Sequence, residues 1–508
     1  IGAGLVGVCC ALYLQREGFR VRLVEKGEPG RGASFGNAGS FGTASCVPFS
    51  MPGILKKVPK MLLDPESPLK LRWGHVPSAL PWFLSSISNS RRERVEEIAA
   101  ARNSLLLKVH EGYAPLIEGA GAQQWVKGDG LLMTFESEAA FEGAAYGLEL
   151  RRRHGVHMDI LDGNEARQIE PALAQSVVKA VSLPDVHRTI DPWRLCDALA
   201  RDFVRRGGEI VNAEARGFEV GAEGPAKIVT DKGPLDVEAV VIAAGVWSRP
   251  LAAQLGTRVP LEAERGYHVM FGNPGFGLRR AITSVDRSIS LADMHEGIRA
   301  SGMAEFAAPD ADPDMRNADI VMRHARALLP GLKGEPASRW MGPRPSHPDS
   351  KPVIGRSPRH RDVYFAFGHD HLGLTMAGIT GKLIAELATG KPASVEEAKQ
   401  RWMRDMAGRS AVLRTGHWLI RTSTGEEVGE VASTTVWHER LTEPEIDAYI
   451  STGEPLQVAG GFTLDGLGAP FVERIDGDPS NVVGLSLPLL RRLLGGLGIV
   501  WTDLWHAP

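Results

Sequence analysis

Residues 8–14 form the first unbroken apolar run of the chain, and residues 19–25 alternate apolar with polar side chains. An apolar run that follows a turn is typical of a buried helix here, whereas strict alternation is typical of a strand. Gly18 lies between the two segments, where glycine commonly ends a helix. The pattern therefore predicts a glycine-rich turn, a helix and a short strand that ends at Glu25.

The turn before this helix reads IGAGLVG and has the spacing G-x-G-x-x-G, which predicts a dinucleotide-binding element. Gly2 allows the tight turn, Gly4 lets a diphosphate approach the backbone, and Gly7 lets the helix pack closely on the sheet. The phosphates would bind at the helix N-terminus, where free N–H groups and the helix dipole favour anions. Glu25 lies 18 residues after Gly7, close to the usual place of the carboxylate that binds ribose hydroxyls.

No hydrophobic strand precedes these glycines, because the chain starts at Ile1. Such a strand normally lies in the middle of the sheet and is buried on both faces. We therefore expect that the sequence is truncated by several residues and that central backbone pairing is lost.

Residues 30–40 are too rich in glycine for either a helix or a strand. Glycine lets a loop follow a ligand closely, so its N–H groups and small hydroxyls would face a phosphate or a ring. A flexible linker is the alternative. The position soon after Glu25 favours the ligand-binding interpretation.

Period and composition predict most of the remaining elements. The predicted helices cover much of 48–110, then 139–154, 191–206, 312–329 and 376–389; the predicted strands are two around a turn at 126–135, then 209–213, 240–244 and 363–367. The basic end of one helix, 151–153, is interpreted as a solvated helix end rather than an anion site.

Two later stretches indicate how the chain is divided. The strand at 240–244 is continuously apolar, as inside a doubly covered sheet, and Gly245 follows it. A strand followed by a glycine thus occurs again far from the first glycine-rich motif, which predicts a single nucleotide-binding domain built from separate parts of the chain. Residues 260–271 and 279–306 alternate and predict a second, mostly antiparallel sheet.

Composition narrows the class of protein. The 508 residues exceed one ordinary core and predict two or three domains. Hydrophobic content of 43% and charged content of 23% are typical of a soluble globular protein, and a net charge of -3 gives no basis for nucleic-acid binding. Four cysteines without metal or disulfide spacing suit a cytoplasmic protein without a metal site. No run reaches the roughly 20 apolar residues of a membrane span, although the start of the chain leaves a signal peptide open.

Spread over residues 1 to about 391 are the segments IGAGLVG, VEKG, GASFGNAG, VVIAAGVWS, ERGYH, GPRPSHPDSKPVIG and GHDHLGLT. Together they resemble the FAD-dependent amine and amino-acid oxidoreductases of the D-amino-acid oxidase superfamily. The resemblance is nearest to the D-amino-acid dehydrogenase group, with glycine oxidase more distant. It implies an α/β fold with a split, Rossmann-like FAD-binding domain (1–47, 166–258 and 336–391) and an α+β substrate domain with an antiparallel sheet (48–165 and 259–335).

The resemblance also implies substrate-binding residues. Arg344 lies in a G-x-R-P segment whose arginine binds the substrate carboxylate in the family, and a guanidinium can make two parallel charge-assisted bonds there. A buried structural ion pair is the alternative. Tyr267 resembles residues that close over the substrate, and His268 should face away from it on a strand. His371 is a candidate gate or carboxylate partner, or else a histidine hydrogen-bonded beside the cofactor.

FAD is the implied cofactor, and we expect it to be non-covalent because the family's linking cysteine is absent near residues 368–375. N–H groups at the start of the following helix would stabilise negative charge on the reduced ring. The residues implied to bind FAD are Gly2, Gly4, Gly7, Glu25, Lys26, Ala33, Ser34, Asn37, Ala38, Gly39, Ala215, Gly245, Gly368, His369, Leu372, Gly373, Leu374 and Thr375. Of these, His369 is expected to be mainly structural.

The implied activity is oxidative deamination of a small amino acid, in the first place a D-amino acid. A hydride passes to the flavin, and the imine hydrolyses to a 2-keto acid and ammonia. No side-chain base is assigned. Glycine, sarcosine or another secondary amine such as D-proline is the alternative substrate. The electron acceptor (dioxygen, a quinone or a carrier protein) and contact with the inner face of a membrane stay open.

Residues 392–508 resemble the second half of the Maf-type nucleoside triphosphate pyrophosphatases, in the segments GRSAVLRTGHW, GEPLQVAGGFT and GDPSNVVGL. The first half of that family, with its basic loop and metal-binding aspartate, is not found, and Val458 and Asp465 depart from the family pattern. We expect an incomplete, marginally stable α/β half-domain without pyrophosphatase activity. A fusion, a recombination or an assembly error near 390–394 would produce it; a nucleotide-binding module and an inactive chimeric chain are the alternatives.

Overall fold

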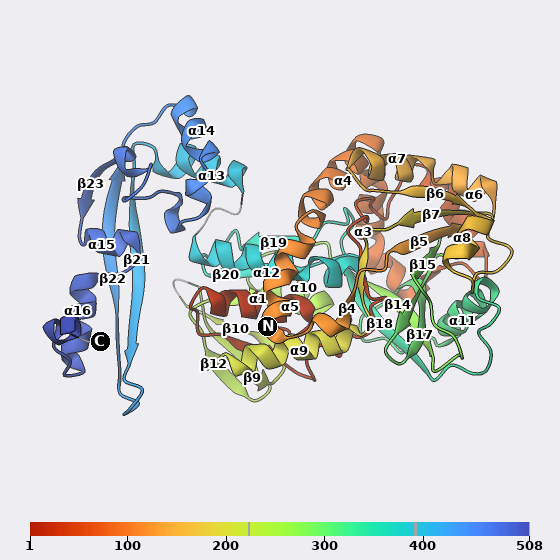
Figure 1. Cartoon of the computed structure of the whole chain (residues 1–508), viewed down its shortest axis with the longest axis horizontal. Coiled ribbons are helices and arrows are strands. Elements are labelled where there is room, and N and C mark those ends of the chain that lie inside the picture. The colour runs from red at the N-terminus through yellow and green to blue at the C-terminus, as the bar shows by residue number, and fades with distance from the viewer. Residues whose placement is uncertain (222–223, 391–393, 507–508) are drawn as a thin grey trace. The chain divides into compact units, whose positions relative to one another are not determined.

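A computed structural model of the protein describes residues 1–221, 224–390 and 394–506 (Figure 1). The chain divides into two compact units, residues 1–385 and 386–508. The predicted junction near 390–394 falls largely on residues 391–393, which lie outside the described residues.

Two small sheets with parallel pairs carry the nucleotide-type motifs of the first unit. Their strands are β1 (Arg22–Glu25) with β9 (Glu209–Asn212), and β13 (Val240–Ile242), β20 (Val363–Phe367) and β19 (Val353–Arg356) in the order β13-β20-β19. The helices of this part are α1 (Leu5–Arg16), α9 (Pro192–Arg205), α10 (Ser248–Gln254) and α12 (Gly373–Thr389). Since α1 packs on α9, β1, β13 and β20, its N-terminus is placed at the ends of both sheets.

Ile1 and Gly2 link these two sheets through their backbone. The N-terminal ammonium of Ile1 donates to the Val241 carbonyl at 2.7 Å, and the N–H of Ala243 donates to the Ile1 carbonyl at 2.9 Å. On the other side, the N–H of Gly2 donates to the Val24 carbonyl at 2.9 Å. The two sheets stay separate, and these backbone bonds join them through Ile1 and Gly2.

A nine-stranded sheet forms the other half of the first unit. Its order is β18-β14-β17-β16-β15-β5-β7-β6, with β3 paired to β17: β18 (Ser338–Ser346), β14 (Glu262–Phe271), β17 (Gly297–Phe306), β16 (Ile289–Met294), β15 (Ala281–Ser284), β5 (Leu131–Phe135), β7 (Lys179–Leu183), β6 (Asp159–Asp162) and β3 (Leu69–Leu71). The sheet is mostly antiparallel, as predicted, and two pairs, β15 with β5 and β3 with β17, are parallel. Each parallel pair joins segments far apart in sequence, which no hairpin connects.

Smaller elements complete this unit. They are the sheet β2 (Ser40–Phe41), β8 (His187–Thr189) and β4 (Val126–Lys127), and the sheet β10 (Ala215–Val220), β11 (Pro225–Thr230) and β12 (Gly233–Asp236). The two strands predicted at 126–135 exist as β4 and β5, but they belong to different sheets and form no hairpin.

Helices surround the nine-stranded sheet. They are α2 (Ile54–Leu63), α3 (Val76–Asn89), α4 (Arg92–Leu106), α6 (Glu138–Gly143), α7 (Ala145–Arg153), α8 (Gly163–Ile169) and α11 (Arg316–Leu328), whereas α5 (Val109–Ala120) packs on α9 and α12. α11 packs on β14 and β17 and closes an apolar core that includes Val269, Ile298 and Val321. Among the described residues, no helix combines the length and the apolar composition needed to cross a bilayer.

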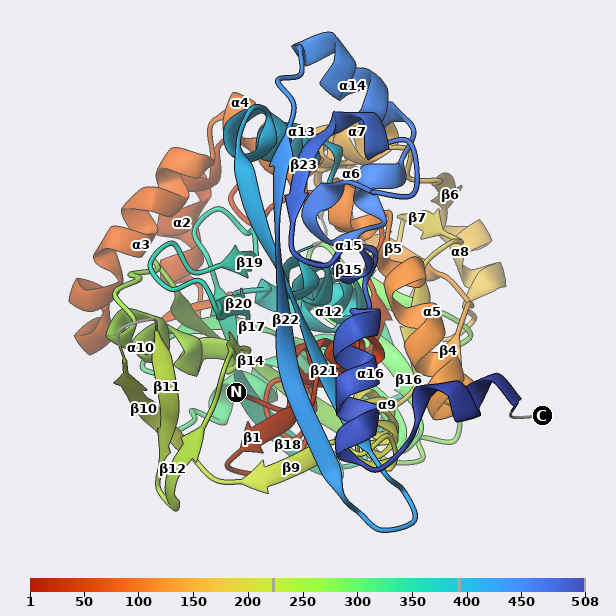
Figure 2. The same ribbon diagram turned by 90° about the vertical axis from the view of Figure 1, so that its left-hand side faces the viewer.

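The second unit is built on an antiparallel sheet in the order β21-β22-β23 (Figure 2). Its elements are β21 (Ser410–Ile420), β22 (Glu427–His438), β23 (Val472–Asp476), α13 (Val395–Arg401), α14 (Glu443–Ser451), α15 (Pro479–Val483) and α16 (Leu487–Gly496). Trp402 is fully buried in its core, and the indole Nε1–H donates to the Gly461 carbonyl at 2.9 Å. The half-domain that was expected to be incomplete therefore has a core of its own.

Candidate functional site

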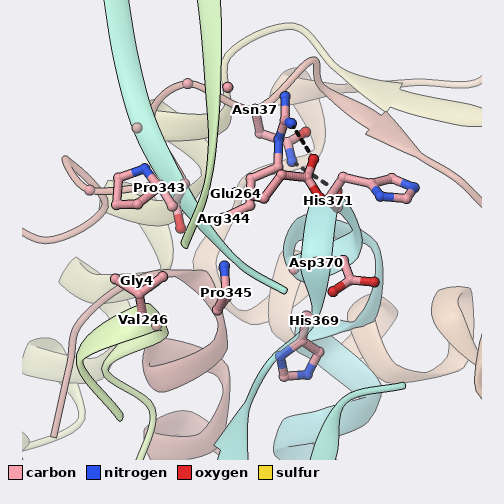
Figure 3. A pocket seen from close by; sticks show the side chains of 18 of the residues that line it. Gly4, Asn37, Val246, Glu264, Pro343, Arg344, Pro345, His369, Asp370 and His371 are labelled. Atoms are coloured by element: carbon pink, nitrogen blue, oxygen red, sulfur yellow. Dashed lines mark hydrogen bonds and ion pairs between the residues drawn. The ribbon is translucent and has the colours of Figure 1, made fainter. Parts of the chain in front are cut away.

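One cavity of about 990 Å³ runs through the first unit (Figure 3). Gly4 at the start of α1, Asn37 in the glycine-rich loop, Arg344 on β18 and Gly373 at the start of α12 all line it. The volume lies at the upper end of ligand sites, which span roughly 300–1,000 Å³. Motifs that are far apart in sequence thus meet at a single cavity.

The start of α1 forms one end of this cavity. Gly4, Leu5 and Val6 line it; the N-cap residue Gly4 supplies no side-chain cap, although Ser34 Oγ accepts the N–H of Leu5. A helix N-terminus offers N–H groups and a positive dipole end to an anion. Gly7 lies behind the turn, and a Cβ atom there would come within 1.9 Å of the Gly2 carbonyl oxygen. The turn can take this shape only with glycine at that position.

Glu25 and Lys26 stand beside this turn at the end of β1. Glu25 Oε2 accepts the N–H of Ala3 at 2.8 Å, and its Oε1 accepts the N–H of Gly27 at 3.1 Å. Lys26 Nζ lies 4.7 Å from the centre of the Trp247 ring. Both residues line the cavity, so a fixed carboxylate and a cation border the space next to the α1 N-terminus.

The glycine-rich loop is tied to its surroundings by hydrogen bonds. Ser34 Oγ accepts the N–H of Leu5 at 3.0 Å, and Asn37 Oδ1 accepts the N–H of Gly39 at 2.9 Å. The buried Arg299 Nη1 donates to the carbonyls of Phe35 and Asn37, each at 2.8 Å. Burial lowers the pKa of Arg299 to about 10, which leaves it charged at neutral pH. The loop is therefore a fixed wall rather than a free linker.

These observations fit the FAD that the sequence implies. A helix N-terminus suits a diphosphate, and the adjoining carboxylate suits ribose hydroxyls. The residues expected to bind FAD that line the cavity are Gly2, Gly4, Glu25, Lys26, Ala33, Ser34, Asn37, Ala38, Ala215, Gly245, His369, Leu372, Gly373 and Leu374. The other four, Gly7, Gly39, Gly368 and Thr375, are not among the residues that line it.

Thr375 is one of the four residues that do not line the cavity, and its contacts are structural. Its Oγ1 accepts the N–H of Gly42 at 3.0 Å and donates to the Ser40 carbonyl at 3.3 Å. Thr375 thus fastens the start of α12 to the segment that follows the glycine-rich loop. His369 also has a structural contact, because its Nε2 lies 2.9 Å from Thr380 Oγ1.

Arg344 lies at the other end of the cavity and is ion-paired. Its Nη1 donates to Glu264 Oε1 at 2.8 Å and to the Met303 carbonyl at 2.9 Å. Met303 has a left-handed backbone, with φ of 69°, at a bulge between β14 and β17. Ser346 Oγ donates to Glu264 Oε2 at 3.3 Å. The guanidinium is thus held at Nη1 by the Glu264 carboxylate and by the carbonyl of Met303, a residue with a strained backbone conformation.

Sequence reasoning assigned no role to Glu264, although it is the first residue of the ERGYH segment. A signal was present, because Glu262, Glu264 and Arg265 fall within one buried strand. Charged side chains in such a strand need partners. The pattern shows that partners must exist, but it does not show which residue supplies them.

Tyr267 and His268 point to opposite faces of β14, as predicted. The Tyr267 hydroxyl donates to Glu305 Oε2 at 2.5 Å and accepts the N–H of Asp314 at 3.2 Å. Burial, and then the bond to Glu305, raise the pKa of Tyr267. His268 instead stacks on Trp340, with ring centres 5.0 Å apart. Tyr267 borders the cavity, but its hydroxyl is already occupied.

Asp370 and His371 form the wall at the start of α12. Asp370 is buried with φ of 50°, and its Oδ1 accepts the N–H of His347 at 3.0 Å. Burial raises the pKa of Asp370 to about 7. His371 is set deep in the protein, yet its side chain is exposed to the cavity. Burial, followed by the charges of Arg102 and Arg344, lowers the pKa of His371 to about 3, so the imidazole is neutral.

The basic end of α7 corrects one sequence interpretation. Residues 151–153 were interpreted as a solvated helix end, and this holds for Arg152 and Arg153, which are exposed and paired with Glu149. Arg151 instead lines the cavity, with its Nε donating to the Ala44 carbonyl at 3.1 Å. Helical geometry turns it away from its neighbours, since successive residues lie about 100° apart.

Comparison with protein families gives two matches along the chain. The model of the DAO family, described as FAD dependent oxidoreductase, matches residues 1–387. The model of the Maf-like protein family matches residues 375–497.

Curated relatives match the first part of the chain. A D-amino-acid oxidase of Bradyrhizobium diazoefficiens is 39% identical over 398 residues, which is 77% of this chain and 94% of that protein. A D-amino acid dehydrogenase of Paramagnetospirillum magneticum is 30% identical over 406 residues, covering 78% of this chain and 95% of that protein.

Solved structures show the same fold at low sequence identity. Glycine oxidase from Geobacillus kaustophilus is 22% identical with a TM-score of 0.59, over 76% of this chain and 92% of that one. Iminodiacetate oxidase from Chelativorans sp. is 20% identical with a TM-score of 0.59, over 78% of this chain and 95% of that one.

Proposed function

The chain belongs to the FAD dependent oxidoreductase family, and from this premise we propose that it oxidatively deaminates a small D-amino acid with non-covalent FAD. One observation carries the proposal: the Arg344 guanidinium and the N-terminus of α1 border the same cavity. The first can bind a carboxylate and the second a diphosphate. The names of the two curated relatives support a D-amino acid over other amines.

In this proposal Arg344 binds and orients the substrate carboxylate. Glu264 and the Met303 carbonyl both use Nη1, so Nε and Nη2 are the donors for the substrate. These two nitrogens form the planar fork that matches a carboxylate. Holding the substrate at this point fixes the carbon that bears the amine, and such orientation lowers the barrier before any chemistry.

Bound in this cavity, FAD would supply the acceptor for a hydride from that carbon, and the imine product would hydrolyse to a 2-keto acid and ammonia. The protein supplies the surroundings. His371 faces the cavity as a neutral imidazole and offers a polar contact without adding charge. The start of α12 presents Gly373 and Leu374 to the cavity, where a helix N-terminus favours negative charge on a ligand.

Anaerobic titration of the yellow holoenzyme tests this function. A D-amino acid such as D-alanine should bleach the flavin absorbance, while L-alanine should not, and a 2-keto acid should accumulate. Glycine, sarcosine and D-proline in the same assay distinguish the secondary-amine alternative. Reoxidation by dioxygen or by a quinone analogue then separates an oxidase from a dehydrogenase. Failure of every D-amino acid would refute the proposal.

A further inference from the structure

Trp340 lies on β18 four positions before Arg344, on the same face of the nine-stranded sheet. Alternate residues of a strand point to one face, so Trp340, Gly342 and Arg344 share it. All three residues line the cavity. The strand that carries the guanidinium therefore also presents an indole to the cavity.

A pair of glycines separates the guanidinium from the indole. Gly266 on β14 and Gly342 on β18 are partners in register, and both line the cavity. A Cβ atom on Gly266 would lie 2.1 Å from Arg344 Nη2. A Cβ atom on Gly342 would lie 2.0 Å from Trp340 Cη2. Since paired Cβ positions of neighbouring antiparallel strands lie about 4.5–5.5 Å apart, Nη2 and Cη2 are separated by no more than about 10 Å. The two groups thus flank one short gap above the glycines.

Two neighbours fix the plane of the indole. The His268 ring stacks on it, with ring centres 5.0 Å apart and ring planes 18° apart. On the glycine-rich loop, a Cβ atom on Gly36 would lie 1.8 Å from Trp340 Cζ3, so the loop backbone is packed closely against the ring. Side chains packed in this way keep one rotamer. Trp340 is therefore a wall of fixed shape at the end of the gap.

The length of the gap suits a short side chain. A carboxylate oxygen lies about 2.8 Å from a guanidinium nitrogen that binds it. A carbon atom packs on an aromatic ring at about 3.5–4.0 Å. Between such an oxygen and such a carbon about 3–4 Å remain, which is about the distance from a carboxylate oxygen to the β carbon of an amino acid. A longer side chain has to turn away from the indole or displace it.

We propose that Trp340 determines substrate specificity by closing the space beyond the β carbon of a substrate whose carboxylate is bound at Arg344. The substrates are then D-amino acids with a short side chain, such as D-alanine and D-serine, and not those with a branched or aromatic one. Atoms forced into a well-packed space cost free energy, which discriminates against the longer substrate. This inference rests on the proposed function and adds the residue that limits the size of its substrate.

Removal of the indole tests the inference, because the loss of a steric wall raises an activity. Wild-type kcat/KM for D-alanine should exceed that for D-leucine by at least about tenfold, the usual effect of groups that do not fit a pocket. In Trp340→Ala, kcat/KM for D-leucine should rise at least about tenfold, while that for D-alanine does not rise. Trp340→Phe, which keeps a ring beside His268, should lie between the two. Trp73→Ala is the control, since Trp73 is 72% exposed and should leave both values unchanged.

A merely structural role for Trp340 would give a different result. Both substrates would then lose activity in Trp340→Ala and neither would gain, which overturns the inference. Loss of FAD from a folded Trp340→Ala variant would assign the indole to the cofactor and also overturn it. If neither variant folds, the wild type decides, because equal kcat/KM for D-alanine and D-leucine shows that no wall limits the side chain.

A binding measurement separates the inference from the activity. If no D-amino acid is oxidised, the proposed function fails, and binding of simple carboxylates to the holoenzyme decides the role of Trp340. Propionate should perturb the flavin spectrum of the wild type at a lower concentration than 4-methylpentanoate does. Trp340→Ala should bind 4-methylpentanoate more tightly than the wild type. Equal binding of 4-methylpentanoate by the two proteins overturns the inference.

Discussion

The guanidinium of Arg344 lies directly against the backbone of Gly266. A Cβ atom on Gly266 would come within 2.1 Å of Arg344 Nη2 and 2.4 Å of Cζ. The two residues are on neighbouring strands, β18 and β14, where Arg344 is paired in register with Glu264. The ERGYH segment therefore supplies both the carboxylate that holds the guanidinium and the gap in which it lies.

Gly266→Ala should displace the Arg344 side chain while leaving the flavin in place. The added methyl group would push the guanidinium from Glu264 and the Met303 carbonyl, because β14 is buried along its whole length and cannot move aside. We expect the apparent KM for the amino acid to rise roughly 10- to 100-fold, as for other small misplacements of an orienting group. Steady-state kinetics measure this, with Gly143→Ala as control, since no atom lies within 4 Å of a Cβ there. An unchanged KM would show that the guanidinium has room to move.

Arg344→Ala should bind FAD normally but lose affinity for the substrate. Removal of two charge-assisted hydrogen bonds predicts an apparent KM on the order of 100-fold higher. The variant should also be less stable, since it leaves the buried Glu264 carboxylate without its partner. Arg339→Ala is the matched control, because Arg339 lies on the same strand and pairs with Asp319 and Glu335 at the surface. An unchanged KM in Arg344→Ala would place the substrate carboxylate elsewhere.

Three buried histidines predict a loss of stability in acid. Burial lowers the pKa of His268 to about 3, of His347 to about 4 and of His369 to about 3. In the unfolded chain these groups titrate at roughly 6.5, so between the two values the unfolded chain binds more protons. The contribution of these histidines to the free energy of unfolding is complete when the pH lies above the pKa of the unfolded chain. It is lost as the pH falls toward 4. Urea midpoints measured from neutral to acidic pH should fall, and His268→Gln should flatten the slope.

Asp370 should affect the pH dependence of stability in the opposite direction to the three histidines. Its pKa is raised from 3.8 to about 7, so between these values the folded chain holds the extra proton. The contribution of Asp370 to stability therefore decreases as the pH rises through this window and is constant above it. Asp370→Asn removes the titration, and asparagine tolerates the positive φ of this position. The variant should gain stability relative to the wild type as the pH rises from acid to neutral. A difference that does not change with pH would show that the carboxyl titrates normally.

Local patterns were sufficient to predict the nucleotide-type elements but not the pairing of strands. β1, β9, β13 and β20 lie within segments whose period or composition predicts them, and α1 extends the predicted helix at both ends. By contrast, the bond between Arg344 and Glu264 joins residues 80 positions apart, and β5 pairs in parallel with the distant β15. Such contacts join residues that are distant in the chain, so no pattern within a short stretch of the sequence reveals them.

The sequence pattern of α4 indicates that Arg102 is a buried charge, but it does not identify the group that Arg102 faces. The buried residues Val95, Ile98, Ala99, Arg102 and Leu106 follow the helical period along α4. An arginine at a core position of such a helix indicates a buried charge with a special partner. The period cannot name such a partner: no described residue makes a hydrogen bond to the guanidinium, and the carboxylate that acts on it electrostatically, Asp370, lies in a segment more than 260 residues away.

The core of the second unit gives a final prediction, which separates its stability from the flavin chemistry. Trp402 is fully buried there, contacts the rings of His438 and Tyr449, and donates to the Gly461 carbonyl. Trp402→Ala should therefore cost that unit about 3–5 kcal/mol, the usual effect of removing a large core side chain. Every residue that lines the cavity belongs to the first unit, so the flavin content and kcat/KM should stay at wild-type values. Calorimetry should show one thermal transition lowered and a second unchanged. Loss of FAD from this variant would mean that the first unit cannot keep its cavity without the second.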